Sequence, residues 1–232
     1  MDNFLRLIAN INHLPIYNSP NLLYELDNKN QIFSIQGKSY NVRCGEWLFY
    51  PGMLFGSCDK WWADWGQRYT PHEGLDITFY RKKTYNITSR NFDICSFDCN
   101  IVVPAMGDGI VLNICKDFLG QSVIIKPSFF SNNKSDNSIR DSKSIFDIEK
   151  SIIAVIYSHI LTACGLTIGD TVTKGQIIGK VADTSMRKSG ITPHLHVSCA
   201  EISTKIPLHE LNWNIFGNPA CASVKFFDPM RI

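Results

Sequence analysis

The sequence lacks any continuous run of about 18 apolar residues, the length that a membrane-spanning helix requires, so we expect no membrane span. Its best apolar stretch, Ile152 to Leu161, is interrupted by Ser158 and His159. The chain also lacks an excess of either charge, since 23 Lys and Arg face 21 Asp and Glu, and we expect no nucleic-acid partner. With 44% hydrophobic and 19% charged residues among 232, a sizeable core is expected and wholesale disorder is excluded.

The N-terminus lacks the parts of a secretory signal, because it has no basic lead, no continuous apolar segment and no small-residue cleavage site. We therefore expect the protein to stay in the cell that makes it, to leave by an unconventional route, or to have lost a leader. Phe4, Leu7, Ile8 and Ile11 instead follow helical spacing, and Pro15 marks the expected end of a short amphipathic helix. We expect this helix to pack on the body of the protein.

Eight cysteines are present, and their even number would permit a disulfide framework in a secreted chain. Without a visible signal, the interpretation we favour is mostly free, buried thiols. Cys95 and Cys99 have the spacing C-x-x-x-C, but a structural zinc site needs four ligands and no second pair follows at the usual spacing.

The chain changes character near residue 50. Residues 1–50 are predicted to form an N-terminal extension with the short helix and a hairpin, because two alternating runs flank Gly37. From residue 51 to 232, short β-type runs recur between Gly, Pro, Asp and Asn, and we predict a mainly antiparallel β domain. Two stretches look inserted, near 84–99 and near 127–150. We interpret the second as the distal end of a hairpin.

Histidines and one aspartate form two short patterns. His72 and Asp76 are four residues apart where Gly74 argues against a helix, and in an extended chain such positions share a face and can converge on one ion. His194 and His196 follow a strand alternation, so both imidazoles point one way. Either pattern alone would be compatible with ordinary hydrogen-bonded side chains, but their joint occurrence is far less expected by accident.

Zinc is the ion that this set of side chains suits. Two imidazoles and one carboxylate, here His72, Asp76 and one of the pair His194 and His196, leave a fourth position open. Three protein ligands with an open position are the pattern of catalytic zinc, whereas structural zinc fills all four. The remaining histidines, including His159 at the end of an apolar run, would be free to move protons.

Further motifs accompany these residues in a fixed order along the chain. They are Leu54-Phe55-Gly56, His72-Glu73-Gly74-Leu75-Asp76, Val103-Pro104-Ala105, Gly120 to Ile125, Tyr157-Ser158-His159, Ile168-Gly169-Asp170, Lys174 to Gly179, Pro193-His194-Leu195-His196 and Phe227-Asp228-Pro229. As a set they resemble the lysostaphin-like (LytM-type) zinc metalloendopeptidases, the peptidoglycan hydrolases of bacterial cell walls. The resemblance covers roughly residues 51–229, with the two insertions as gaps.

The resemblance implies a fold of antiparallel strands around an open groove, with one Zn²⁺ per chain. It implies His72, Asp76 and His196 as zinc ligands and His159 and His194 as the unligated catalytic pair. The implied substrate is a peptidoglycan stem peptide or cross-bridge. Because no signal is visible, we expect the bacterial cytoplasm, or the cell envelope reached by an unconventional route or after removal of a leader. We expect a monomer.

The sequence departs from the family at two places near the site. The turn after the Gly179 motif is Ala182-Asp183-Thr184-Ser185, and the family's F-E after the last histidine is here Val197-Ser198. We expect neither departure to touch a zinc ligand.

Two functions are compatible with these residues. The first is a zinc-dependent endopeptidase, and the second is a non-catalytic module of the same fold that recruits a partner or a cell-wall peptide. The presence of all five site residues favours the enzyme. The aromatic cluster upstream of His72 has two equal interpretations, a groove wall or ordinary packing, and it consists of Trp61, Trp62, Trp65 and Tyr69. Arg68 is a weak candidate for contact with a substrate carboxylate.

Overall fold

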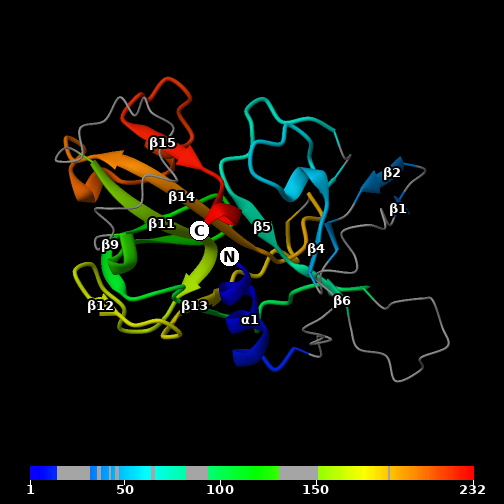
Figure 1. Ribbon diagram of the computed structural model, residues 1–232, viewed down its shortest axis with the longest axis horizontal. Helices are drawn as coiled ribbons and strands as arrows, with labels where there is room; N and C mark the ends of the chain where they lie inside the picture. Colours follow the sequence, from blue (N-terminus) through cyan, green and yellow to red (C-terminus); the bar gives the residue numbers. More distant parts are fainter. Residues whose placement is uncertain are drawn as a thin grey trace.

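The computed structural model of the protein is shown in Figure 1. It describes residues 1–14, 32–35, 38–41, 43–44, 47–63, 66–81, 94–130, 151–187 and 189–232. Residues 84–93 of the first expected insertion and 131–150 of the second lie outside this part of the chain, as does Trp65.

A nine-stranded sheet forms the body of the molecule. Its strands are β5 (Leu75–Ile77), β8 (Val102–Pro104), β9 (Gly109–Lys116), β10 (Gln121–Pro127), β11 (Ser151–Thr162), β12 (Thr171–Val172), β13 (Ile177–Val181), β14 (Leu195–Ser203) and β15 (Val224–Phe227). They follow the order β12-β9-β10-β11-β13-β8, and β14 pairs with β11, β15 and β5. Every one of these pairings is antiparallel, so the predicted mainly antiparallel β fold is confirmed.

Both faces of the central strands are buried, which explains their nearly continuous apolar sequences. On β11, Val155 and Tyr157 belong to the larger hydrophobic core, whereas Ala154 and Ile156 belong to a second, smaller core. The segment after β14 covers the smaller core with Trp213 and other side chains of the short helix α3 (Trp213–Phe216). Because successive side chains of β11 point to opposite faces of the sheet, this one strand contributes to both cores.

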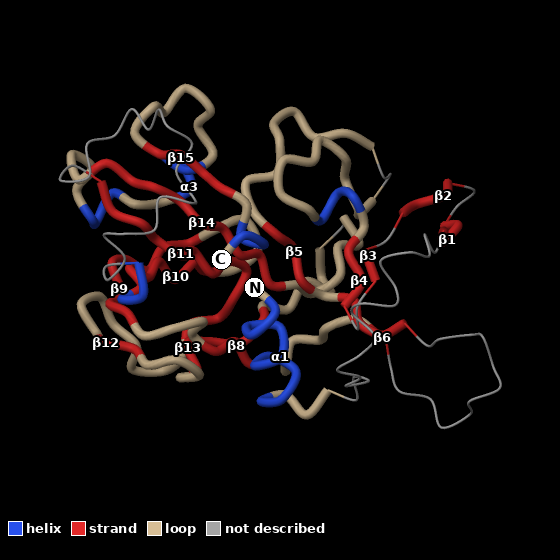
Figure 2. Tube along the Cα trace, viewed as in Figure 1, coloured by secondary structure: helices blue, strands red, loops and turns tan. Residues whose placement is uncertain are grey.

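A second sheet lies at the other end of the molecule, as the tube drawing in Figure 2 shows. Its order is β3-β4-β6-β7, and its strands are β3 (Arg43–Cys44), β4 (Trp47–Phe49), β6 (Phe79–Arg81) and β7 (Ile94–Cys95). Only Thr78 separates β5 of the main sheet from β6 of this one. In the stretch where a hairpin is expected, β1 (Ile32–Ile35) and β2 (Lys38–Asn41) pair antiparallel.

Helix α1 (Asp2–Ile11) packs against the main sheet beside β8 (Figure 2). It buries Phe4 and Ile8, and the ring of Phe4 meets that of Tyr157 edge to face at 6.0 Å. Asn12 ends the helix and holds the strand, because its Nδ2 donates to the Val102 carbonyl at 2.9 Å and its Oδ1 accepts from the Val102 N–H at 2.7 Å. The division of the chain at residue 50 stays a prediction.

The expectation about cysteines is correct in one respect and wrong in another. The seven cysteines whose side chains are described are all free thiols. Only Cys199 among them is buried, however, and Cys58 and Cys164 are exposed. Burial raises the pKa of the Cys199 thiol to about 12, which keeps that thiol protonated.

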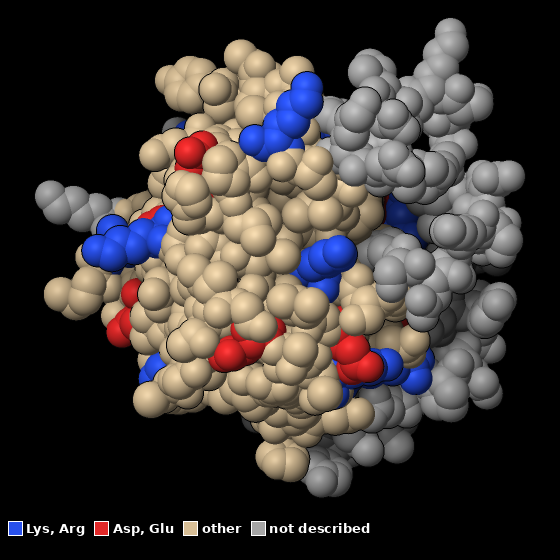
Figure 3. All heavy atoms as spheres, turned by 90° about the vertical axis from the view of Figure 1, so that its left-hand side faces the viewer, with Lys and Arg blue, Asp and Glu red and all other residues tan. Residues whose placement is uncertain are grey.

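The helices and the surface charge of the described residues indicate how far the chain meets what a membrane span or a strongly charged partner would require. None of their helices has the length and apolar character needed to span a bilayer. On the face in Figure 3, basic and acidic side chains are scattered among uncharged ones, so neither sign of charge dominates that face.

The register of three strands positions the candidate site. Across β11 and β14, Ser158 faces His196, and across β14 and β5, His196 faces Asp76. Three adjacent strands therefore bring residues 76, 158 and 196 into one row, although they are far apart in the sequence.

Candidate metal centre and active site

The structure brings all five predicted site residues together. Asp76 lies on β5, His159 on β11 and His196 on β14, while His72 and His194 lie just before β5 and β14. Four of these side chains are buried, and that of His159 is 12% exposed. The side chain of His159 is therefore the most open of the five.

Three donor atoms form a triangle of the size that zinc needs. The Nε2 of His72 lies 3.1 Å from Nδ1 of His196 and 3.2 Å from Oδ1 of Asp76, and the third side, between His196 and Asp76, is 2.8 Å. Zinc bonds of about 2.0–2.1 Å in a tetrahedral site place donors about 3.3 Å apart. This set of His72, Asp76 and His196 also stands out as a potential metal-binding group in the described part of the chain. The donors therefore fit one zinc ion.

Gly74 allows the chain to pass close to β14. A Cβ atom at this position would lie 2.5 Å from the Val197 carbonyl oxygen and 2.7 Å from Nε2 of His196. Any side chain would push the 72–76 segment away from His196, so the glycine between His72 and Asp76 is needed for the triangle.

The nitrogen of His72 and of His196 that lies outside the triangle has its own partner. The Nδ1 of His72 lies 3.2 Å from the Leu54 carbonyl oxygen, which accepts its hydrogen, so Nε2 would be available to a metal ion. The Nε2 of His196 lies 2.7 Å from Oγ of Ser198, so Nδ1 would be the nitrogen available to a metal ion. Ser198, at one of the two departures from the family, is thus a direct neighbour of His196 although it is not one of the three donors.

The second oxygen of Asp76 is held by two side chains that the sequence did not assign to this role. The indole N–H of Trp61 donates to Oδ2 at 2.7 Å, and the Arg68 guanidinium lies 3.5 Å from the same oxygen. Oδ1 is thus the oxygen that faces the two histidines. Burial acts to raise the pKa of Asp76, but the charge of His72 and hydrogen bonds from His196 and His72 hold that pKa well below its ordinary value.

These contacts separate the two interpretations of the upstream aromatic cluster. Trp61 is only 3% exposed and supports Asp76, so it packs within the site, and its ring also forms part of a pocket wall. Trp62 is half-buried beneath the guanidinium of Arg68, whose Cζ lies 4.5 Å from the ring centre. Tyr69 is fully exposed. Arg68 also donates to the Gly52 carbonyl at 2.8 Å, so its charge is directed into the protein.

His194 and His159 lie beside the triangle. The Nδ1 of His194 lies 2.9 Å from the Thr192 carbonyl oxygen, and its Nε2 lies 3.9 Å from Oδ1 of Asp76. The ring centre of His159 is 4.9 Å from that of His194 and 5.6 Å from that of His196. Burial lowers the pKa of His194 to about 3 against the opposing charge of Asp76, so the ring is neutral at pH 7.

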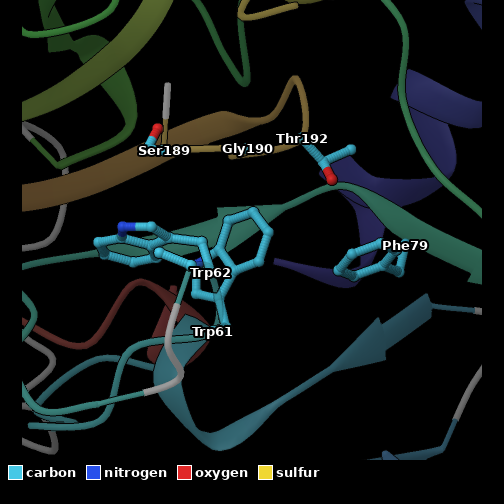
Figure 4. Close-up of a pocket in the computed structure, with 7 residues that line it drawn as sticks. Trp61, Trp62, Phe79, Ser189, Gly190 and Thr192 are labelled. Atoms are coloured by element: carbon cyan, nitrogen blue, oxygen red, sulfur yellow. The ribbon is translucent and has the colours of Figure 1, made fainter. Parts of the chain in front are cut away.

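A pocket of about 340 Å³ adjoins the site on the side of His194 (Figure 4). Its walls are uncharged and come from the segment 61–63, from β6 and from the segment 189–192. The lining residues are Trp61, Trp62, Ala63, Phe79, Ser189, Gly190 and Thr192. Trp61 and Thr192 connect the pocket to the site, because both also contact His194, the former edge to face at 5.1 Å between ring centres.

Aromatic rings also flank the site on another side. Trp213 meets the ring of His196 at 5.7 Å between centres, and its indole N–H donates to Oγ of Ser122 at 2.8 Å. Phe118 is 69% exposed and lies 6.0 Å from Trp213. No motif in the sequence indicated this contact, because α3 reaches the site only through the folding of the chain after β14.

Comparisons with known proteins concern the fold. No family model and no curated protein matches the chain. Among solved structures, the chain is similar to lysostaphin, with 17% identity and a TM-score of 0.32 over 59% of this chain and 38% of that one. It is also similar to Csd3 of Helicobacter pylori in a hexagonal crystal, with 19% identity and a TM-score of 0.30 over 78% of this chain and 40% of that one. A second Csd3 structure, from an orthorhombic crystal, gives 19% identity and a TM-score of 0.31 over 78% and 42%.

The chain thus spans about two fifths of the length of each of these structures. The sequence motifs resemble the lysostaphin-like group, and lysostaphin itself is one of the structures found. Similarity at this level assigns no activity to this chain.

Proposed function

We propose that the protein is a zinc-dependent endopeptidase that hydrolyses peptide bonds in peptidoglycan stem peptides or cross-bridges. One observation carries the proposal: the triangle of His72, Asp76 and His196 has the dimensions of a three-ligand zinc site, with two further histidines beside it. Three protein ligands are typical of catalytic zinc, which keeps one position open.

Each protein group has a definite task in this reaction. When bound, zinc would polarise the scissile carbonyl and make water more acidic. The Leu54 carbonyl and Ser198 orient the rings of His72 and His196, and Trp61 and Arg68 orient Asp76. His159 and His194 remain for proton transfer.

Hydrolysis breaks the C–N bond of the peptide and joins the carbonyl carbon to the oxygen of a water molecule. One of His159 and His194 accepts a proton from that water. The other stabilises the developing negative charge on the carbonyl oxygen or delivers a proton to the nitrogen that leaves as an amine. The ring centre of His159 lies 5.6 Å from that of His196, and Nε2 of His194 lies 3.9 Å from Oδ1 of Asp76. Either ring could perform either task.

The substrate class rests on the motif resemblance, and peptidoglycan offers small residues that suit the groove which that resemblance implies. The proposal takes the protein to act as a monomer on a cell-wall peptide. All five residues of the site are present, which supports the enzyme over the non-catalytic module.

Three forms of the full chain test the proposal: the wild type, His196→Ala and His159→Ala. We expect the wild type to bind one zinc per chain and to release peptides from purified peptidoglycan. His196→Ala should lose zinc and cleavage together, whereas His159→Ala should keep zinc and lose most of the turnover. Zinc binding by a wild type that attaches to peptidoglycan without cleaving it would overturn the endopeptidase in favour of the binding module.

A further inference from the structure

We propose that Asp117 is a positioning residue that fixes the ring of His159 at the site, an inference that rests on the proposed function. Asp117 directly follows β9, in the turn that leads to β10. Its side chain is 0% exposed, and it lies outside every motif that identified the site in the sequence. A buried carboxylate needs partners, and those of Asp117 identify its role.

Five donors converge on this carboxylate. Oδ1 accepts from the backbone N–H groups of Leu119 at 2.9 Å and Gly120 at 2.7 Å, and it lies 3.1 Å from Nδ1 of His159. Oδ2 accepts from Oγ of Ser122 at 2.8 Å and from the backbone N–H of His159 at 2.8 Å. The bonds from Leu119 and Gly120 close the turn after β9. The two contacts with His159 hold its backbone and its ring.

His159 needs such support because its backbone is unusual. Its φ of 63° lies in the left-handed region, which non-glycine residues seldom adopt. The pairing of β10 with β11 shifts at this point, so Ser158 and His159 together face Ser122. Such a bulge leaves one residue outside the ladder and redirects its side chain. Oδ2 of Asp117 accepts the backbone N–H of the residue that the bulge displaces.

The contact also defines which ring nitrogen of His159 can act. A carboxylate only accepts hydrogen bonds, so Nδ1 of His159 carries the hydrogen that lies between the two groups. The proton-accepting lone pair of the neutral ring is then on Nε2, the nitrogen that remains for a substrate. The neighbouring rings of His194 and His196 lie 4.9 and 5.6 Å away. Asp117 thus orients a proton-transfer residue without touching substrate.

Kinetics of Asp117→Asn test the role. The amide has one accepting oxygen and an NH2 group in place of the second, so it cannot accept from all five donors. We expect kcat to fall roughly 100-fold, the contribution of a well-placed acid or base, while KM and bound zinc stay as in the wild type. The control is Asp108→Asn, at the opposite end of β9, where an exposed carboxylate likewise caps a backbone N–H, that of Lys174 at 2.7 Å. This control should leave kcat unchanged.

A double-mutant cycle separates positioning from folding. In a His159→Ala background, Asp117→Asn should cost no further activity, because the residue through which Asp117 acts is gone. An equal loss of kcat with and without His159 would overturn the proposal, as would loss of zinc from Asp117→Asn.

A spectroscopic measurement decides the proposal without any activity and without a substitution. The ¹⁵N shifts of the His159 ring in the wild-type full chain should show hydrogen on Nδ1 and none on Nε2. A neutral ring with its hydrogen on Nε2 would overturn the proposal. Because this result does not depend on peptide cleavage, failure of the endopeptidase function would show in the cleavage assay alone.

Discussion

The indole N–H of Trp61 donates to Oδ2 of Asp76 at 2.7 Å, and this bond keeps the other carboxylate oxygen directed at His72 and His196. A partner of a metal ligand commonly changes metal affinity by about 10–100-fold when it is removed. We therefore expect Trp61→Phe to weaken zinc binding by about that factor while the fold persists.

Competition with a chelator measures the affinity of this variant. Trp62→Phe is the matched control, since the neighbouring indole stacks under Arg68 and should leave zinc affinity near that of the wild type. An unchanged affinity in Trp61→Phe would mean that Arg68, at 3.5 Å from the same oxygen, is sufficient to hold Asp76.

Zinc should stabilise the folded chain, because its ligands come together from segments that are distant in the sequence. A ligand at about 100 times its dissociation constant adds about 2.7 kcal/mol. For a chain of this size, that raises Tm by roughly 5–10 °C. Calorimetry with zinc and with a chelator measures the difference. His196→Ala should abolish the shift, and His209→Ala, whose side chain is 80% exposed, should retain it. A shift that survives in His196→Ala would place the zinc elsewhere.

Sequence patterns were sufficient for the parts of the site that follow local rules. The alternation around His194 and His196 predicts a strand, and β14 begins at Leu195. The spacing of His72 and Asp76 predicts convergence, and their donors are 3.2 Å apart. Both features depend on the period of an extended chain, which the sequence displays directly.

The supporting contacts could not be predicted in the same way, because they join segments whose relative position depends on packing. Trp61 reaches Asp76 from a loop, and Trp213 reaches His196 from the segment after β14. Asp117 lies 42 positions from His159, and the bulge that brings them together has no signature at either residue. An aspartate at the start of a Gly-containing turn is the one local signal that could have drawn attention to it.

The Asp117 carboxylate should also make stability depend on pH. Burial acts to raise its pKa, but the hydrogen bond and charge of His159, with backbone N–H bonds, hold the pKa well below its ordinary value. A group whose pKa is lower in the folded than in the unfolded protein contributes stability above the unfolded value, about 3.9, and loses it as the pH falls below that value. Stability should therefore decline from about pH 5 towards pH 2.

Asp117→Asn tests this dependence in chelated protein, where loss of zinc in acid does not contribute. The variant should lower the free energy of unfolding at pH 7 by roughly 1–3 kcal/mol, because buried donors lose an ionised acceptor. Its stability should also change less between about pH 5 and pH 2 than that of the wild type. Denaturant unfolding across this range measures both effects, with Asp108→Asn as the exposed control. If the free energy of unfolding of the variant changed with pH as that of the wild type does, this pH dependence could not be assigned to Asp117.

The pocket beside His194 should contribute to substrate binding and little to chemistry. Its walls are uncharged, and Trp62 is a half-buried wall residue whose indole packs on Trp61 and lies beneath Arg68 rather than on the donor atoms themselves. A neutral side chain of a peptide would bury apolar surface against this ring, so Trp62→Ala should raise KM about tenfold, equivalent to about 1.4 kcal/mol, with kcat and zinc content little changed. Steady-state cleavage of a cell-wall peptide measures this, and Tyr69→Ala is the control, because Tyr69 is fully exposed and lines no wall of the pocket. If Trp62→Ala instead lowered kcat at constant KM, the pocket would act on the transition state through Trp61 and His194, whose ring centres are 5.1 Å apart.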